Sequence, residues 1–394
     1  MEKTVMERAE AVKEYCTMCR RRLHRRPELS LGEYETTEFI KQELRKMGIP
    51  ILDIPLETGA VAIIEGKNPG PVSAIRADID ALPITEETGK PYASENPGVM
   101  HACGHDGHAA ILLGIAKVLW DMRDELRGVV KLIFQPGEEG LLGARKVIES
   151  GALKDPDVES IVCWHGWPYL KVGEVGAWPG QYMASADMFD AVMKGQGGHG
   201  CRPYKAVNPI VATAAAVSAI QNICASEIVT AQQAVISVCK IHAGIANNVI
   251  PDSVEFGGTV RCLDPEVRLQ LERKLKRTIE GAAATFGCEC EINYIHGVPS
   301  LYNSPEIVKE LLSAAEQVLG CERIKELDGP VMGGEDFSYY VEEGCPGVFM
   351  RLGIAAEGEE ERTLHNCHFD FNDDAIPTGV AVMVQYVLNK HGEL

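Results

Sequence analysis

An octet of closely spaced metal-binding side chains is the part of this sequence that carries the most chemistry. Residues 101–108 read His-Ala-Cys-Gly-His-Asp-Gly-His, so five side chains able to bind or orient a metal ion lie within eight residues. In an extended segment, residues two apart point to the same side, so Cys103 and His105 can face one ion. A helical pattern begins near Asp106, the expected N-cap, and the positive end of that helix favours the thiolate of Cys103. The octet predicts a metal site, with a structural zinc knot as the alternative.

Two adjacent glutamates, Glu138 and Glu139, follow an apolar strand pattern. Because neighbouring residues in an extended segment project in opposite directions, two such carboxylates at one site are expected to have different roles. One can bind a metal ion while the other stays free as a general base, as the activation of metal-bound water requires. An isolated pair of this kind is more often a solvated turn, but its place at a strand end favours the catalytic interpretation.

Two further histidines complete a candidate ligand set. His165 ends an apolar strand pattern and His365 stands in a Thr-Leu-His-Asn segment, although each of them alone is also typical of a core histidine. One catalytic zinc ion usually takes three protein ligands and leaves a position for water. Five ligands suffice for two ions if one ligand bridges them, so the sequence predicts a two-metal hydrolase. The five candidates are Cys103, His105, Glu139, His165 and His365.

Three other features are weaker. Asp78 and Asp80 follow a strand pattern and are candidates for carboxylates that orient a ligating imidazole, or else are a polar strand end. The segment 195–200 formally matches GxGxxG, but Pro203 and Pro209 follow where a phosphate-binding helix would begin, so we reject a dinucleotide site. The sequence contains no P-loop, GxSxG or HExxH motif.

The elements that must position these side chains follow an α/β pattern. Strand-like runs at residues 72–75, 129–134 and 161–164 each lead into acidic residues or a histidine. Open α/β sheets assemble ligand sites at the carboxyl ends of their strands, so these side chains are expected to meet there.

The pattern changes at about residue 185. A β-α-β-β-α-β order follows, with expected helices at 209–223 and 265–286, and it suits one small sheet backed by two helices. The α/β pattern returns after about residue 296. We therefore expect a discontinuous catalytic domain of residues 1–184 and 296–394, interrupted by a lid domain of residues 185–295.

Composition limits the possible classes of protein. The chain has 394 residues, of which 45% are hydrophobic and 24% charged, as in soluble globular proteins of about two domains. A net charge of −19 argues against nucleic acid or an anionic membrane as a partner. No signal peptide or membrane-length apolar run is evident, so we expect a cytoplasmic protein. Its thirteen scattered cysteines indicate reduced core residues rather than a disulfide scaffold.

Taken together, these motifs resemble those of the di-metal amidohydrolases, a family that includes hippurate hydrolase, plant auxin-amino-acid conjugate hydrolases, N-acetyl-diaminopimelate deacetylase and bacterial aminoacylases. The resemblance rests on the octet and on the motifs at 135–140 (QPGEEG), 164–168 (WHGWP) and 364–366 (LHN), and it extends over nearly the whole chain. It implies an α/β, metallopeptidase-like catalytic domain whose central mixed sheet is flanked by helices. It also implies an inserted α+β, ferredoxin-like lid through which two subunits form a homodimer.

The resemblance assigns roles to individual residues. Glu138 matches the general base, and Asp80 matches an aspartate that orients a metal ligand, whereas Asp78 stands where the wider exopeptidase group has a ligand histidine. His199 matches a lid histidine that, in relatives, reaches the active site of the neighbouring subunit. The residues that match the metal ligands are Cys103, His105, Glu139, His165 and His365, and those that match substrate-binding lid positions are Asn248 and Arg261.

The predicted function is hydrolysis of the amide bond of N-acyl amino acids at two divalent metal ions. A thiolate with imidazoles suits Zn, Co or Ni, and carboxylates also admit Mn. A dipeptidase or carboxypeptidase with the same chemistry is the alternative enzyme. A metal-holding protein that has lost catalysis is the alternative outside the enzymes, although a purely structural site needs no free base.

Overall fold

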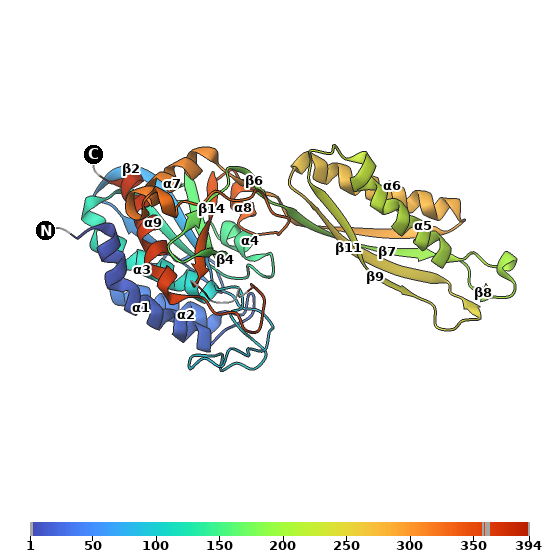
Figure 1. Ribbon diagram of the computed structural model, residues 1–394, viewed down its shortest axis with the longest axis horizontal. Coiled ribbons are helices and arrows are strands. Elements are labelled where there is room, and N and C mark those ends of the chain that lie inside the picture. Colours follow the sequence, from blue (N-terminus) through green and yellow to red (C-terminus); the bar gives the residue numbers. More distant parts are fainter. Residues whose placement is uncertain (1–2, 357, 359–362, 393–394) are drawn as a thin grey trace. The chain divides into compact units, whose positions relative to one another are not determined.

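A mixed sheet of six strands organises the segments that carry the predicted ligands. We describe it from a computed structural model, which covers residues 3–356, 358 and 363–392. The sheet has the order β1-β3-β2-β4-β14-β5 (Figure 1). Its strands are β1 (Ala60–Glu65), β2 (Asn68–Asp78), β3 (Arg127–Gln135), β4 (Ser160–Lys171), β5 (Val175–Gly176) and β14 (Gly347–Ala355).

The central strands β3, β2, β4 and β14 run parallel, so their carboxyl ends meet at one edge. Asp78 ends β2 directly opposite Gln135, the last residue of β3, as the sequence pattern predicts. His165 differs from the prediction. It lies within β4 opposite Arg351, because β4 continues to Lys171 where it pairs with β14.

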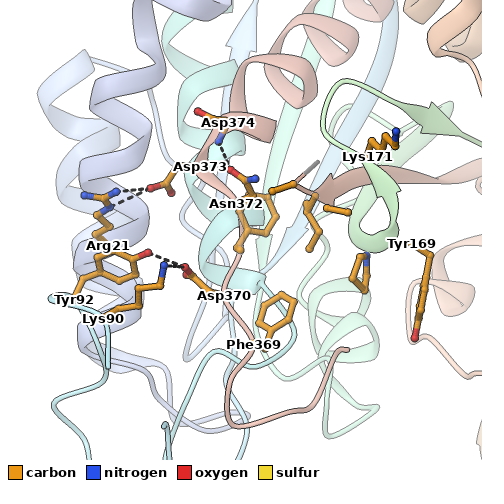
Figure 2. A pocket seen from close by; sticks show the side chains of 15 residues that line it. Arg21, Lys90, Tyr92, Tyr169, Lys171, Phe369, Asp370, Asn372, Asp373 and Asp374 are labelled. Carbon is orange, nitrogen blue, oxygen red and sulfur yellow. Dashed lines mark hydrogen bonds and ion pairs between the residues drawn. The ribbon is translucent and has the colours of Figure 1, made fainter. Parts of the chain in front are cut away.

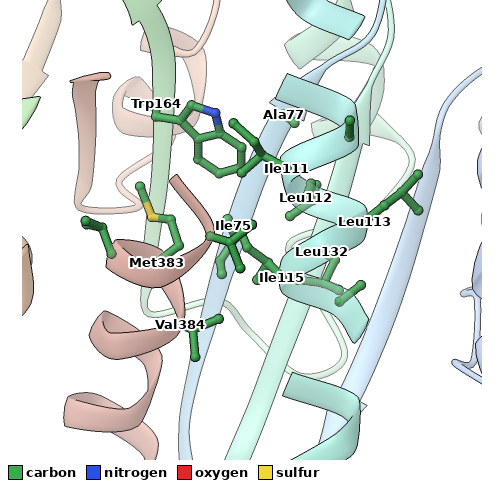
Figure 3. Close-up of a cluster of buried hydrophobic side chains, with 14 of the residues drawn as sticks. Ile75, Ala77, Ile111, Leu112, Leu113, Ile115, Leu132, Trp164, Met383 and Val384 are labelled. Atoms are coloured by element: carbon green, nitrogen blue, oxygen red, sulfur yellow. The ribbon is translucent and has the colours of Figure 1, made fainter. Parts of the chain in front are cut away.

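Helices cover this sheet and supply its core. The helices α1, α3 and α9 contact one another, α2 contacts α3, and α7 contacts α9. Figure 3 shows Ile111 of α3 and Met383 of α9 packed with apolar side chains of the strands, among them Trp164 of β4. The helices are α1 (Val5–Arg25), α2 (Tyr34–Met47), α3 (His105–Asp121), α4 (Gly143–Glu149), α7 (Pro305–Leu319), α8 (Ser338–Glu342) and α9 (Ile376–His391). The predicted α/β class, with a mixed sheet flanked by helices, is confirmed.

The start of α3 differs from the sequence prediction. Its N-cap is Gly104, whose φ of 89° is a left-handed conformation that glycine adopts without strain. Asp106 therefore lies in the first turn of the helix and not at the cap. Its buried carboxylate pairs with Arg20 and His24, so a tertiary ion pair has replaced local capping.

The chain divides into two compact units. Unit 1 comprises Met1–Gly180, Tyr302–Gly329 and Tyr339–Leu394, and unit 2 comprises Gln181–Leu301 and Pro330–Ser338. The short strands β6 (Gly180–Met183) and β13 (Leu301–Asn303) lie where the chain passes between the units.

Unit 2 is built on an antiparallel sheet of order β12-β7-β11-β9 (Figure 1). Two helices pack against each other and against this sheet, and the chain order is the β-α-β-β-α-β arrangement expected from the sequence. The elements are β7 (Ser185–Lys194), α5 (Pro209–Asn222), β9 (Ala234–Ala243), β11 (Ser253–Cys262), α6 (Pro265–Thr285) and β12 (Glu289–Val298). A separate two-stranded ladder joins β8 (Gly198–His199) to β10 (Val249–Ile250).

Within the described chain, one helical segment, Pro209–Glu227, is long and apolar enough to span a membrane by length and composition. Core helices of globular proteins pass the same test. Its inward residues Ala212, Ala216 and Ile220 are fully buried in the core of unit 2. We therefore describe it as a core helix of this unit.

Candidate metal centre

The five predicted ligands meet in unit 1. The donor atoms of Cys103, His105 and His165 lie within 4.8 Å of one another, and so do those of Cys103, Glu139 and His365. The Sγ of Cys103 is 3.3 Å from Nε2 of His165, and Nε2 of His365 is 3.3 Å from Oε1 of Glu139. Segments far apart in sequence thus form two groups of donors that have Cys103 in common.

Asp80 orients His105 toward this centre. The Nδ1 of His105 donates to Oδ1 of Asp80 at 3.1 Å, and Oδ2 of Asp80 accepts the backbone N–H of Glu139 at 3.0 Å. Within the part of the chain that the structure describes, the buried Nε2 of His105 has no hydrogen-bond partner. Burial opposes protonation of His105, but Asp78, Cys103 and the hydrogen bond with Asp80 hold its pKa well above the usual range, so binding of a metal ion at Nε2 would displace a proton.

His165 is held in an equivalent way by its own backbone. Its Nδ1 donates to the carbonyl oxygen of Gly166 at 2.9 Å, which leaves the Nε2 lone pair for the centre. Burial keeps the pKa of His165 well below its usual range, so the ring is neutral. The ring of Phe349 stacks on it at a centroid distance of 5.8 Å and limits its rotation.

The electrostatics of the cluster favour a cation. Burial raises the pKa of the Cys103 thiol, so its thiolate needs a positive partner to form. Hydrogen bonds with Cys103 and Glu139 raise the pKa of His365 to about 10, so this imidazole carries positive charge among acidic neighbours. Neutral imidazoles with a thiolate and a carboxylate are the donor set that divalent transition metals prefer, and metal binding would displace those protons.

His365 has an unusual backbone conformation and a partly solvent-exposed side chain. Its φ of 59° lies in the left-handed region, which costs energy for a residue other than glycine. Its backbone N–H donates to the carbonyl of Ala102 at 2.8 Å, which ties the segment to the octet. About half of its side chain is exposed, so solvent and substrate can reach this side of the centre.

Glu138 lies beside the donors in a fixed turn. It is buried, and its carboxylate is within 4.8 Å of donor atoms of His105 and Glu139. The preceding Gly137 has a φ of 64°, and its N–H donates to Oε1 of Glu33 at 2.7 Å. The turn therefore keeps both glutamates at the centre.

Glu33 is a residue that the sequence analysis missed. Its buried carboxylate accepts hydrogen bonds from Gly137 N, from Leu31 N at 2.9 Å and from Thr58 Oγ1 at 2.9 Å. Glu33 stands at the N-cap of α2, but within the described residues it makes no side-chain cap bond to its own helix. Nothing in the local pattern distinguishes this long-range role from capping.

The other side chains of the octet serve the structure around the centre. The Nδ1 of His108 donates to Asp78 at 2.6 Å and its Nε2 accepts from Gly166 N at 2.8 Å, so both ring nitrogens are occupied. Asp78 is also paired with Arg76 at 2.7 Å, which suits a structural role rather than metal binding. Burial lowers the pKa of His101 to about 4, so this ring is neutral.

The predicted lid residues all belong to unit 2, whereas the five ligands belong to unit 1. His199 and Asn248 are neighbours, since Gly200 N donates to the Asn248 carbonyl at 2.9 Å and both side chains are exposed. His199 Nδ1 accepts from Cys201 N at 3.2 Å, which leaves the ring hydrogen on Nε2. Arg261 lies apart from this pair on β11, where its Nη1 donates to the Met332 carbonyl at 3.1 Å.

A separate cavity of about 590 Å³ in unit 1 is lined by charged side chains of both signs (Figure 2). Asp370 accepts from Tyr92 at 2.8 Å and pairs with Lys90 at 3.1 Å, and Arg21 pairs with Asp373 at 2.8 Å. Because these charges neutralise one another, the cavity offers little net charge to recognise a ligand.

The chain is similar to known proteins in sequence and in fold. The sequence model that defines peptidase family M20/M25/M40 matches residues 74–389 of this chain. The chain is 43% identical over 358 residues to an N-acetylcysteine deacetylase of Bacillus subtilis, covering 91% of this chain and 92% of the relative. It is 35% identical over 376 residues to thermostable carboxypeptidase 1 of Saccharolobus solfataricus, covering 93% of each.

A solved structure shares the architecture. The YXEP protein of Bacillus subtilis, described as a dinuclear metal binding peptidase of the M20 family, superposes with a TM-score of 0.85 at 38% identity, covering 96% of this chain and 98% of the other. Fold and site thus define a metal-dependent amidohydrolase. The chain belongs to peptidase family M20/M25/M40, and the predicted family resemblance is confirmed.

Proposed function

We propose that the chain hydrolyses the amide bond of N-acyl amino acids at a centre of two divalent metal ions. The observation that carries the proposal is the pair of donor groups that have Cys103 in common, with the buried carboxylate of Glu138 beside them. A purely structural metal site needs no carboxylate beyond those of its ligands. The deacetylase and the dinuclear peptidase among the relatives support the substrate class and the number of ions.

The protein's own residues divide the chemistry between them. The ligands are Cys103, His105, Glu139, His165 and His365. When bound, two divalent ions supply the Lewis acidity that lowers the pKa of water toward neutrality and polarises a carbonyl. Glu138 takes the proton of the attacking water, and it gives that proton to the amine nitrogen as the C–N bond breaks. The products are a carboxylate and a free amino acid.

We propose that unit 2 binds the substrate and forms the homodimer interface. His199, with its hydrogen on Nε2, is suited to donate to the developing oxyanion, where one donor typically contributes about 10²-fold to 10³-fold in rate. Arg261 has a planar fork of donors that fits the substrate carboxylate, and Asn248 adds an amide beside His199. These roles rest on the family resemblance and on the positions of the three residues in unit 2.

The metal identity and the compartment are also proposals. A site of one thiolate, imidazoles and carboxylates suits Zn, Co or Ni, and it admits Mn. All thirteen cysteines are free in the structure, which is typical of proteins in a reducing compartment. We therefore propose a cytoplasmic enzyme.

A substrate panel on reconstituted enzyme tests the proposed function. The chain is loaded in turn with Zn, Mn, Co and Ni, and N-acetyl amino acids, benzoyl-glycine and dipeptides are assayed side by side. We expect kcat/KM to be highest for acylated amino acids with a free α-carboxylate. Enzyme that retains its metal and hydrolyses none of the acyl amino acids would overturn the proposal.

Carboxypeptidase or dipeptidase activity is the second candidate. It is favoured by the thermostable carboxypeptidase among the relatives. The discriminating substrates are a dipeptide and its N-acetylated amino acid counterpart with the same C-terminal residue. A preference for the dipeptide would favour the second candidate, since the two share all chemistry at the scissile bond and differ only in the acyl group.

A further inference from the structure

A second group of metal-binding side chains lies on the surface of unit 1, outside the centre described above. Glu87, Cys367 and His368 offer one carboxylate, one thiol and one imidazole, and their donor atoms lie within 4.8 Å of one another. None of the three has a role in the proposed hydrolysis. The combination of sulfur, nitrogen and oxygen donors is typical of zinc sites.

Backbone hydrogen bonds hold the two contributing segments together. The N–H of Glu87 donates to the carbonyl of Cys367 at 2.9 Å. The N–H of His368 donates to Oδ1 of Asn366 at 2.8 Å, which fixes the turn that carries the thiol and the imidazole. The relative position of the donors is therefore set by the main chain rather than by flexible side chains alone.

The hydrogen bonding of His368 leaves its Nε2 available to bind a metal ion. Its Nδ1 donates to the carbonyl of Glu87 at 3.1 Å, so the lone pair is on Nε2. A ligating histidine almost always donates its other N–H to a carboxylate, carbonyl or water. This arrangement orients Nε2 toward an ion before the ion arrives.

The spacing between donors fits an ion better than it fits a direct bond. The Nε2 of His368 is 3.7 Å from Oε2 of Glu87, which is too long for a hydrogen bond. Tetrahedral zinc with bonds of about 2.0–2.3 Å places neighbouring ligand atoms about 3.3–3.8 Å apart. The two side chains already stand at that separation.

The exposure of the group permits an ion to enter from solvent. The side chains of Glu87 and His368 are 62% and 63% exposed, and Cys367 is half-buried. A net charge of −19 also favours the approach of cations. Three protein ligands leave the fourth tetrahedral position for water.

We propose that Glu87, Cys367 and His368 bind a third divalent ion of zinc type, with water as the fourth ligand. The ion clips the segment that directly follows His365 to the segment at Glu87. Because Cys367 is only two residues from His365, occupation of this site restrains the backbone of a proposed ligand of the hydrolytic centre.

Metal counting on the full chain tests the proposal. Equilibrium dialysis against Zn²⁺ is performed on the wild type, Cys367→Ser, His368→Gln and the control Cys321→Ser, whose exposed thiol stands next to Glu322. We expect the wild type and the control to bind one ion more than the other two variants, in which the dissociation constant of that ion is at least about 10-fold higher. Equal stoichiometry in all four proteins would overturn the proposal.

A spectroscopic measurement separates this site from the hydrolytic centre. Co²⁺ is added to Cys103→Ser and to Cys103→Ser/Cys367→Ser, and the thiolate-to-cobalt charge-transfer absorption is recorded. We expect the band in the first protein and its loss in the second, whereas a band in both or in neither contradicts the site. When the wild type, Cys367→Ser and His368→Gln all carry only the two tightly bound ions, their rates of hydrolysis should be equal, so failure of the proposed function is detected independently.

Discussion

The Nδ1 of His105 lies 3.1 Å from Oδ1 of Asp80, while the other oxygen of Asp80 accepts the backbone N–H of Glu139 at 3.0 Å. One carboxylate thus orients two proposed ligands, one through its ring and one through its main chain. Its pKa is lowered despite burial, because His105 and Ser30 donate to it, so Asp80 is ionised and acts only as an acceptor.

Replacing Asp80 by Asn should weaken metal binding. The amide cannot accept from both His105 and Glu139 as the carboxylate does, so the imidazole loses its fixed orientation. We expect metal affinity to fall about 10-fold to 100-fold, with a parallel fall in kcat, measured by competition with a chelator and by steady-state kinetics. The exposed Asp53→Asn serves as a control, and unchanged metal affinity in Asp80→Asn would show that the contact does not position His105.

Glu33 allows a matched pair of substitutions. In Glu33→Gln the amide oxygen can still accept from Leu31 N and Gly137 N, and the amide nitrogen can donate to Thr58 Oγ1. In Glu33→Ala those buried groups lose their partner, which costs about 1–3 kcal/mol for each unsatisfied group. We expect the free energy of unfolding, measured with urea, and kcat/KM to be near the wild-type values in Glu33→Gln and strongly reduced in Glu33→Ala. Similar values in the two variants would contradict the positioning role.

Gly107 is expected to tolerate no side chain. A Cβ at this position would lie 2.7 Å from ring atoms of Phe371, which packs beneath the octet. Gly107→Ala should therefore lower the free energy of unfolding by about 1–3 kcal/mol and disturb the adjacent ligand His105. Adding Phe371→Leu should recover part of the metal affinity, as measured by metal titration. Wild-type stability and metal affinity in Gly107→Ala alone would show that the Phe371 ring moves aside freely.

His24 should make stability depend on pH. Burial opposes protonation of His24, but Asp106 at 2.8 Å and Glu86 at 3.4 Å outweigh it and raise the pKa to about 9. Because the pKa is higher in the folded than in the unfolded chain, this stabilisation is full below about pH 6.5 and is lost as the pH rises through about 9. It amounts to on the order of 3 kcal/mol.

The measurement is urea unfolding of the wild type and His24→Gln between pH 6 and pH 10. The variant should be less stable at pH 6, and the difference should shrink toward pH 10. A difference that is independent of pH would mean that the His24 ring acts through packing and not through its charge.

The sequence predicted the fold and the class of enzyme where patterns are local. The strand-like runs at 72–75, 129–134 and 161–164 indicated strands that the structure contains, and α5 and α6 of unit 2 lie within a few residues of their expected bounds. Such patterns succeed because the period of apolar residues directly reflects which face of an element is buried.

What the sequence could not predict depends on contacts between distant segments. Asp106 satisfies every local requirement of an N-cap, yet its carboxylate forms ion pairs with Arg20 and His24 of α1 instead. Glu33 resembles a helix-capping residue, yet it holds the turn before Glu138. His165 lies inside β4 because pairing with β14 extends that strand beyond its apolar run.

The central claim is that Glu138 is the proton carrier beside a two-metal centre and is not itself a ligand. Glu138→Gln keeps the size of the side chain and removes only its basicity. With the exposed Glu159→Gln as control, we predict that both variants keep two ions at the hydrolytic centre, and that kcat for N-acyl amino acid hydrolysis is about 10²-fold to 10⁴-fold lower in Glu138→Gln alone. Turnover within a few-fold of wild type, or loss of metal from Glu138→Gln, would contradict the claim.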